Sequence, residues 1–279
     1  MKKLTLLIYL SLGVLIGCSQ KEELINYLST TENIAYDIHP QTMLDVYTPQ
    51  ITTGNNSVLI YIHGGGWCYG DKSEWDLSKI EYFCNMGYIC VSVNYRLSPD
   101  VKHPTHIQDV AKAINWVEDN ISNYGGNPSN IMLIGHSAGA HITALAVTNQ
   151  NYLIDAGVNI YNIKTACILD AGAYLIMNEQ VFDDNNILNM IYGAVGNDMN
   201  SDLWKDFAPY NYIDADKYIP NLIIAHSDAQ YRYNANSLFC SKLDECNKDY
   251  IEYILAGYSH SDVLLKFPYY IDINMLYNK

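Results

Sequence analysis

The sequence predicts an α/β protein with a mostly parallel central sheet, helices on both of its faces and an insertion, a possible lid, after the sixth strand. Two observations lead to this prediction. Short apolar runs rich in branched side chains alternate along the chain with stretches of helical spacing. Two of those runs, at residues 58–62 and 131–134, lead directly into glycine-containing turns, as buried parallel strands often do.

Length and composition favour one large domain. The chain has 279 residues, of which 49% are hydrophobic and 16% are charged, which is typical of a globular protein with a full core. The sequence contains no internal repeat, low-complexity tract or Pro- or Ser-rich linker that would divide it. We therefore expect a single domain over residues 31–279.

Local patterns predict each element in turn. Two early segments alternate enough to be antiparallel edge strands, and later apolar runs predict buried strands. Apolar residues at three- and four-residue spacing predict helices. The predicted strands cover residues 34–38, 43–47, 58–62, 88–94, 131–134, 165–169, 222–225 and 251–255. The predicted helices cover residues 72–86, 105–123, 137–148 and 262–276, the last broken near Pro268.

The alternation breaks down over residues 171–218. This stretch mixes aromatic and methionine side chains, such as Met177, Phe182, Met190 and Trp204, with polar residues. A long insertion above the strand ends is where a lid or a substrate pocket would lie. An equally good interpretation is a set of ordinary surface helices that pack on their own aromatic side chains.

The spacing Gly135-x-Ser137-x-Gly139 predicts a nucleophilic serine. The motif follows the apolar run at residues 131–134 and precedes a predicted helix, so Ser137 would lie on a sharp strand-to-helix turn. Side chains two residues to either side of the serine would collide in such a turn, which explains the two glycines.

A second motif, His-Gly-Gly-Gly-Trp at residues 63–67, predicts an oxyanion hole. Its glycines allow the backbone amides of Gly65 and Gly66 to approach a reacting carbonyl. Together with the amide of Ala138 they would stabilise a developing negative charge, a contribution of about 3 kcal/mol for a single donor. Either motif alone could be an accidental turn. The occurrence of both motifs, each directly after a predicted strand, is specific for a serine hydrolase site.

A serine nucleophile needs a base and an orienting carboxylate, and in a fold of this type they follow in the chain order Ser, acid, His. His260 follows the last predicted strand and is expected to be the base. Asp228 follows the run at residues 222–225 and is expected to be the acid. Asp170, which also ends a strand, is the alternative, and Asp262 a weaker one. The remaining histidines precede the C-terminal loop, and His63 is expected to brace the glycine loop.

From about residue 31 to its end, the chain resembles α/β-hydrolase-fold esterases. It is most similar to hormone-sensitive-lipase-like carboxylesterases, bacterial feruloyl/acetyl esterases and arylformamidases. Besides the two motifs above, the resemblance rests on Asn-Tyr-Arg-Leu-Ser-Pro at residues 94–99 and Tyr-Gly-Gly-Asn-Pro at residues 124–128. It implies Ser137 as nucleophile and Gly65, Gly66 and Ala138 as oxyanion donors. The acid loop departs from the family pattern: Ala-His-Ser-Asp at residues 225–228 replaces a His-Gly-x-x-Asp type of loop.

The resemblance implies a serine carboxylic ester hydrolase that acts on small acyl or aryl esters through an acyl-enzyme, without a metal or an organic cofactor. Two alternatives remain open. One is an amidase of the arylformamidase type, which would keep the triad and cleave a different bond. The other is a non-catalytic binding protein on the same fold, because a fold alone does not establish chemistry.

The first residues predict export. Lys2 and Lys3 precede a largely apolar run over residues 4–16, which is typical of a signal peptide and too short to span a bilayer comfortably. Gly17 followed by Cys18 resembles a bacterial lipobox, which implies cleavage before Cys18 and lipid on its sulfur. The alternative is an ordinary secretory signal. We expect a signal peptide at residues 1–17, a tether at 18–30, and a cell-envelope lipoprotein anchored to the membrane only through this lipid.

Charge and cysteine content exclude several classes of partner. The formal net charge of −14 argues against nucleic acid and against a basic membrane-binding patch. No Cys-x-x-Cys or His-x-x-x-His spacing suggests a metal site. The six cysteines other than Cys18 allow 15 disulfide pairings, between which the sequence does not choose. Cys90 and Cys167 fall in predicted core strands, where a free thiol behaves as a small hydrophobe. The oligomeric state is not predicted.

Overall fold

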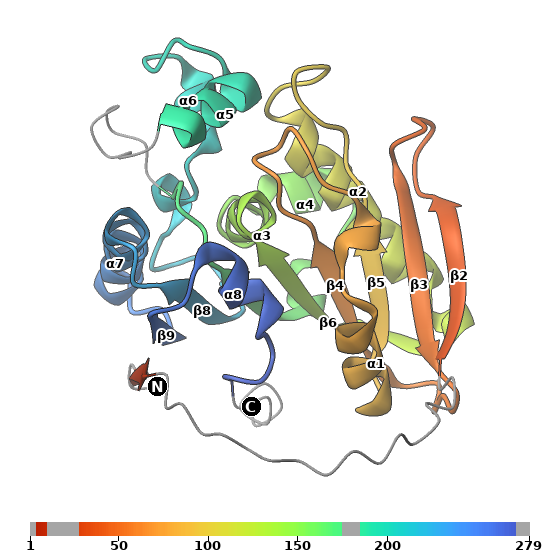
Figure 1. Cartoon of the computed structure of the whole chain (residues 1–279). Coiled ribbons are helices and arrows are strands. Elements are labelled where there is room, and N and C mark those ends of the chain that lie inside the picture. Colours follow the sequence, from red (N-terminus) through yellow and green to blue (C-terminus); the bar gives the residue numbers. More distant parts are fainter. Residues whose placement is uncertain (1–3, 10–27, 175–184, 272–279) are drawn as a thin grey trace.

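A nine-stranded sheet runs through the molecule in the order β1-β9-β8-β7-β6-β4-β5-β3-β2 (Figure 1). The structure, a computed structural model, describes residues 4–9, 28–174 and 185–271. β2 and β3 pair antiparallel, as do β3 and β5, and every other neighbouring pair is parallel. The predicted mostly parallel sheet is therefore confirmed.

The strands lie close to the predicted ranges. They are β2 (Leu28–Ala35), β3 (Met43–Pro49), β4 (Asn56–Ile62), β5 (Ile89–Val93), β6 (Gly126–His136), β7 (Ile163–Leu169), β8 (Asn221–Ser227) and β9 (Tyr250–Ala256). The prediction for residues 34–38 was wrong in its bounds: the strand begins at Leu28 and ends at Ala35. It ends there because the chain turns before β3, where Thr42 N–H donates to the His39 carbonyl over 2.9 Å.

The first strand of the sheet was not expected from the sequence. β1 (Leu4–Tyr9) pairs in parallel with β9, from Leu4 opposite Ile251 to Tyr9 opposite Ala256. We expected residues 1–17 to lie outside the fold. In the full-length chain the open edge of β9 offers unpaired backbone groups, and an extended apolar segment satisfies them. Cys18 and most of the expected tether lie outside the described residues.

Helices cover both faces of the sheet, as predicted, and each face has its own apolar core. One core joins α1 (Leu77–Asn85) and α8 (His260–Leu265) to the sheet. The other joins α2 (Thr105–Asn120), α3 (Ala138–Thr148) and α7 (Gln230–Glu245). Within these cores Cys90 and Cys167 are fully buried free thiols, as their strand positions predicted. α4 (Asn151–Asp155) and α7 were not predicted from the sequence.

Local capping explains where the predicted helices divide or end. The stretch 72–86 is split into a short 3-10 helix η1 (Lys72–Glu74) and α1, because the Asp76 carboxylate accepts from Ser78 N–H over 2.8 Å and caps α1. α2 continues into η2 (Ile121–Tyr124). α8 ends at Leu265, before Pro268, and residues 272–276 of that prediction lie outside the described part.

The described part of the insertion contains short helices beyond the sheet. α5 (Asn185–Val195) and α6 (Asp202–Phe207) lie at the top of Figure 1, and η5 (Pro209–Tyr212) follows α6 in the chain. Their apolar side chains, including Ile191, Trp204 and Phe207, join the core that contains α3. Met177 and Phe182 of the predicted insertion lie outside the described residues.

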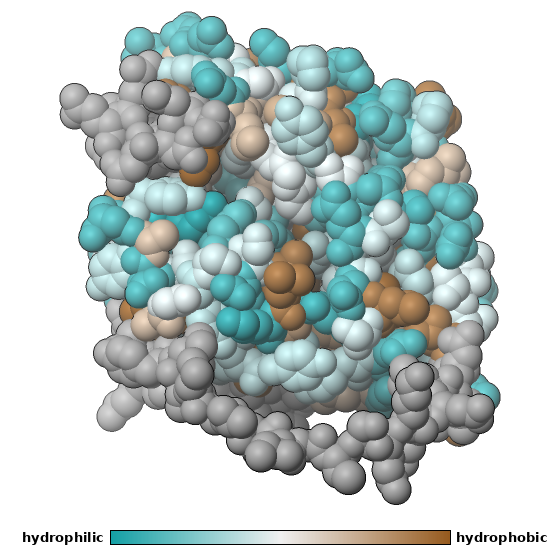
Figure 2. Space-filling model, in the orientation of Figure 1, coloured by the Kyte–Doolittle hydropathy of each residue, from teal (hydrophilic) through white to brown (hydrophobic). Residues whose placement is uncertain are grey.

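The surface seen in Figure 2 is mainly hydrophilic, and apolar side chains form small separate patches on it. Among the helices of residues 4–9, 28–174 and 185–271, none has the length and apolar character needed to cross a membrane.

One carboxylate attaches the insertion to the rest of the domain. Asp206 in α6 accepts from His103 Nε2 over 2.7 Å, from the hydroxyls of Tyr152 and Tyr212, and from Asn149 Nδ2 over 3.2 Å. Burial by itself raises the pKa of Asp206, but these hydrogen bonds, that of His103 first, outweigh it and lower the pKa to about 2.

We expect Asp206→Asn to lower the free energy of unfolding by about 1–2 kcal/mol at pH 7, because the amide cannot accept all these bonds. The folded-state pKa lies below the ordinary carboxyl value. The contribution is therefore complete above about pH 4 and is lost as the pH falls towards 2. Urea unfolding between pH 7 and pH 3 should show the gap between the two proteins narrowing below pH 4.

The matched control is Asp202→Asn in the same helix, whose side chain is 98% exposed and pairs with the exposed Lys205. It should unfold like the wild type. Equal unfolding curves for the Asp206 and Asp202 variants would contradict the anchoring role of Asp206.

Candidate active site

Ser137 lies at the strained turn between β6 and α3. Its backbone has φ 56° and ψ −117°, a conformation that L-residues rarely adopt. A Cβ at Gly135 would collide with the backbone of Gly139, and one at Gly139 would collide with the carbonyl of Ile62 in β4. The glycines at the −2 and +2 positions are thus required by close backbone approach, as the spacing predicted.

The glycine loop after β4 curls against this turn. Gly65 and Gly66 have φ +97° and +59°, and the Gly65 carbonyl accepts from Cys68 N–H at 3.1 Å and Tyr69 N–H at 2.9 Å. His63 braces the loop, as expected: its Nδ1 lies 2.9 Å from the Gly64 carbonyl oxygen and its ring stacks on Tyr95. Because burial lowers the pKa of His63, its ring is neutral and Nδ1 is the donor.

The carboxylate that contacts His260 is Asp170. His260 Nδ1 lies 2.6 Å from Asp170 Oδ2, and Asp170 Oδ1 accepts from Ser227 N–H at 2.8 Å and Ser227 Oγ at 3.0 Å. Asp170 is fully buried and follows β7, the strand beside β6, which leads into the Ser137 turn. Its φ of 54° turns the side chain from the strand end towards α8. Because the carboxylate accepts at Nδ1, Nε2 is the ring nitrogen left for a reacting group.

The expectation that Asp228 is the partner of His260 was wrong. Asp228 is exposed, and its Oδ1 accepts from Gly257 N–H over 3.2 Å. The reason is the length of β8, which continues through His226 and Ser227. Ser227 thereby takes the position against Asp170, and Asp228 emerges one residue further on. Asp262 is likewise engaged elsewhere, in the capping box of Ser259 at the start of α8.

Arg232 is a site residue that the sequence reasoning missed. Its Nε lies 3.3 Å from Asp170 Oδ2 and its Nη1 donates to the Asp170 carbonyl. Burial raises the pKa of Asp170, but the His260 hydrogen bond and the Arg232 charge outweigh it and hold the pKa below its ordinary value. The only sequence signal was that Arg232, one of two arginines, follows the end of β8 by a few residues.

His136 is a second missed residue. Its ring stacks on that of His260 at a centroid distance of 4.4 Å, and its Nε2 lies 3.0 Å from the His260 carbonyl oxygen. Burial, followed by the nearby His260, lowers the pKa of His136 to about 3, so the ring is neutral and Nε2 donates to that carbonyl. His136 therefore holds the backbone of the expected base from the strand that carries the nucleophile.

The remaining histidines are engaged away from Ser137. His103 bonds Asp206, His106 bonds the Ser98 hydroxyl, His141 bonds the Phe207 carbonyl and His226 bonds Glu252. His39 lies in the exposed turn before β3. Of the histidines in the described residues, His260 is thus the one that combines a carboxylate partner with a place beside the serine.

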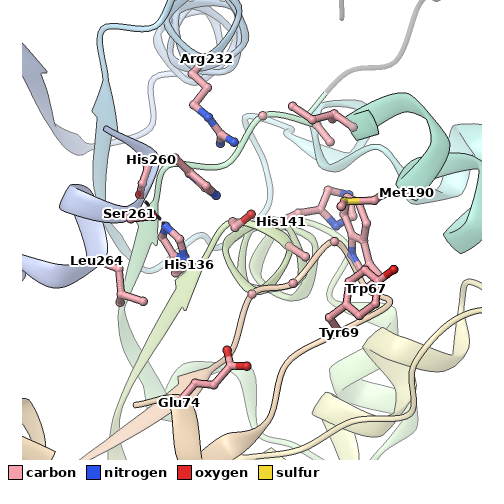
Figure 3. A pocket seen from close by; sticks show the side chains of 18 of the residues that line it. Trp67, Tyr69, Glu74, His136, His141, Met190, Arg232, His260, Ser261 and Leu264 are labelled. Carbon is pink, nitrogen blue, oxygen red and sulfur yellow. Dashed lines mark hydrogen bonds between the residues drawn. The ribbon is translucent and has the colours of Figure 1, made fainter. Parts of the chain in front are cut away.

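A pocket of 740 Å³ opens over these groups. Its lining includes Ser137, Ala138, His260, Gly65 and Gly66. In Figure 3, His260, Ser261 and Leu264 lie on one side of the pocket, and Trp67, His141 and Met190 lie on the other. Met190 comes from the insertion helix α5, and its sulfur fills the space that a Cβ on Gly66 would need. Helix α5 therefore rests directly on the glycine loop.

Within residues 4–9, 28–174 and 185–271, no three His, Cys, Asp or Glu side chains gather in an arrangement that could hold a metal ion.

Comparison with known families gives a match over most of the domain. The model of the BD-FAE family matches residues 44–243, which include the glycine loop, the Ser137 turn, Asp170 and Arg232. His260 follows the matched range. The match covers more than half of the chain.

Curated relatives match over part of their own length. Esterase LipQ of Mycobacterium tuberculosis is 39% identical over 128 residues, which are 45% of this chain and 30% of LipQ. The probable isoprenylcysteine alpha-carbonyl methylesterase ICMEL2 of Arabidopsis thaliana is 28% identical over 248 residues, 85% of this chain and 58% of the relative. The chain thus spans less than two thirds of the length of these relatives.

A solved structure supports the fold. Esterase B from Lactobacillus rhamnosis superimposes with a TM-score of 0.74 at 20% sequence identity, covering 90% of this chain and 84% of that chain. The expected α/β-hydrolase fold is confirmed.

Proposed function

Because the chain belongs to the BD-FAE family, we propose that it is a serine carboxylic ester hydrolase that uses Ser137, His260 and Asp170. The observation that carries this proposal is the 2.6 Å contact between His260 and Asp170, together with the place of His260 in the same pocket lining as the strained Ser137 turn. Nucleophile, base and orienting acid are the three parts that acyl transfer by a serine requires.

The proposed reaction begins with attack of Ser137 Oγ on the ester carbonyl carbon, while His260 Nε2 takes the hydroxyl proton. Asp170 holds the imidazole in the tautomer with Nδ1 protonated and stabilises the imidazolium that forms. His260 then gives the proton to the leaving alcohol oxygen as the bond from the carbonyl carbon to that oxygen breaks. Water activated by the same histidine cleaves the acyl-enzyme and regenerates the serine hydroxyl.

The carbonyl oxygen becomes an oxyanion in both steps. We propose that the amides of Gly65, Gly66 and Ala138 donate to it, at about 3 kcal/mol for a single such donor. Gly65 and Gly66 have positive φ angles, and a side chain at either position would clash with neighbouring atoms of the pocket wall. With glycine at both positions the loop backbone lies directly against the pocket, which supports this role. No step in this reaction calls for a metal or an organic cofactor.

Pocket size and lining support small acyl or aryl esters as substrates. A volume of 740 Å³ is in the range of sites for small molecules, and much of the lining is apolar. Trp67, Ile187 and Met190 provide apolar contact area beside Ser137.

Ser137→Ala should abolish hydrolysis of p-nitrophenyl acetate, because the alanine has no oxygen to form the acyl-enzyme. A fluorophosphonate probe should label the wild-type protein and fail to label the variant. Circular dichroism of both proteins serves as the control for folding. Labelling of the variant at another residue would overturn the nucleophile assignment. If the wild-type protein hydrolysed N-formylkynurenine but no ester, an amidase would be favoured. If it hydrolysed neither N-formylkynurenine nor any ester, a binding protein would be favoured.

Asp170→Asn should lower kcat by several orders of magnitude, because the amide favours the wrong imidazole tautomer. The corresponding change in a well-studied serine protease lowers kcat by roughly 10⁴-fold. Asp228→Asn is the matched control and should keep nearly normal activity, since Asp228 is exposed and accepts a hydrogen bond from the Gly257 amide rather than from His260. If the Asp228 variant lost its activity while the Asp170 variant stayed near normal, the orienting carboxylate would have to be assigned to Asp228.

For the start of the chain we propose an exported lipoprotein that is cleaved before Cys18 and anchored in the cell envelope by lipid on that cysteine. The apolar run after Lys2 and Lys3 and the Gly17-Cys18 pair support this proposal.

In a bacterial host that processes lipoproteins, radiolabelled palmitate should enter the wild-type protein and should not enter Cys18→Ala. The variant should instead keep its signal peptide or appear in the soluble fraction. Incorporation of label that survives the Cys18→Ala change would contradict the lipid anchor.

A further inference from the structure

The proposed chemistry divides the pocket into two sides, and the following inference rests on that proposed function. His260 must deliver its proton to the leaving oxygen, so the alcohol part of the ester has to lie next to His260. The acyl part then extends to the opposite side, where Trp67, Met190 and His141 lie (Figure 3). That side is built from aromatic and apolar groups, and it suits an uncharged acyl chain.

Glu74 lines the remaining wall of the same pocket. In Figure 3 its side chain rises from below the catalytic groups, and its carboxylate points into the cavity. Among the described residues, no hydrogen bond or ion pair engages this carboxylate, and the residue is exposed. A carboxylate facing a substrate cavity without a partner is free to interact with a bound molecule.

The short helix η1, which carries Glu74, is held firmly in place. Asp71 accepts from Ser73 N–H over 2.9 Å at its start, and Lys72 N–H donates to Asn94 Oδ1 over 2.6 Å. The Lys72 side chain is buried and lies 2.8 Å from Asp45 Oδ2, and Ser92 Oγ donates to the Lys72 carbonyl over 2.6 Å. These contacts fix the backbone of η1 next to the cavity, so the position of the Glu74 charge is built into the fold.

The other ionisable groups of the pocket leave this charge uncompensated. Arg232 is neutralised by Asp170, 3.3 Å away. Burial, as the first cause, lowers the pKa of His136 and of His141 to about 3, so both rings are neutral near pH 7. Among the charged residues that line the pocket, Glu74 therefore carries the charge that has no opposite charge beside it.

We propose that Glu74 is a specificity-determining residue: because the acyl side of the pocket is apolar, the Glu74 charge acts on the alcohol part of the ester, which occupies the rest of the cavity. Glu74 favours alcohol groups that carry a positive charge and disfavours those that carry a negative charge. The carboxylate acts through its field at the cavity, where a partly enclosed site screens charges less than bulk water does. The overall charge of −14 adds a weaker effect of the same sign on approach.

The test uses two pairs of acetate esters matched in shape. Acetylcholine is compared with its uncharged carbon analogue 3,3-dimethylbutyl acetate, and 4-acetoxybenzoate with the neutral 4-acetoxybenzamide. For the full-length wild-type protein, kcat/KM should be higher for the cation than for its analogue and lower for the anion than for its amide. Glu74→Gln should bring both ratios closer to one by about fivefold, lowering the cation ratio and raising the anion ratio, and Glu74→Lys should invert both preferences.

Glu32→Gln removes the same charge from the exposed strand β2, away from the pocket lining, and should leave both ratios unchanged. Ratios that do not move in Glu74→Gln, or that move equally in Glu32→Gln, would overturn the inference. Failure of the proposed function gives a different result, because the wild type would then hydrolyse neither of the uncharged esters.

Discussion

The carboxylate of Asp170 is fully buried at the end of β7 and receives hydrogen bonds from Ser227 of β8 and His260 of α8. Arg232 of α7 adds a charge contact from a third element. A buried carboxylate without such partners would be strongly destabilising, so each of these elements has to be in register for the charge to be tolerated. The same contacts that stabilise the charge orient the proposed base. The stability of this region and the geometry of the proposed catalytic groups therefore depend on one side chain.

His136 extends this coupling to Ser137, the proposed nucleophile. It ends β6 immediately before Ser137, and its ring supports His260 by stacking and by a hydrogen bond to the backbone. The serine and the histidine are far apart in the sequence, yet a residue adjacent to one holds the other. His260 is the first residue of the short helix α8, directly after a loop, and a contact of this kind reduces the number of positions available to it.

The sequence was most informative where chemistry requires a particular local geometry. The glycines around Ser137 and in the loop at residues 63–67 could be interpreted because backbone approach and positive φ leave few other residues possible. The acid could not be chosen with the same certainty. Asp170 and Asp228 both follow predicted strands, and the choice depends on whether β8 ends at Ala225 or at Ser227. Strand ends are set by pairing with β7 and β9, and local sequence does not encode that pairing. Helix α7 was missed for a related reason, because its mainly polar composition gives little apolar periodicity.

Arg232 and His136 could not be assigned roles from the sequence, because their roles come from contacts with Asp170 and His260, which are distant from them in the sequence. Glu74 belongs to the same group. Its importance arises from the absence of a nearby counter-charge among the described residues, which is a property of the assembled pocket. Residues of this kind become visible when the charges and contacts of the whole site are considered together.

The contact between Met190 and Gly66 separates two properties that evolution has to change independently. Gly65, Gly135 and Gly139 tolerate almost no substitution, because backbone atoms fill the space that a Cβ would need there. Met190 belongs to a helix outside the sheet and reaches the pocket through a flexible side chain. Replacements at this one position would reshape the cavity next to the reacting carbonyl without disturbing the strands. The parts of the site that require fixed residues thus lie at the ends of the sheet strands, and the part that can change to fit other substrates lies in the insertion.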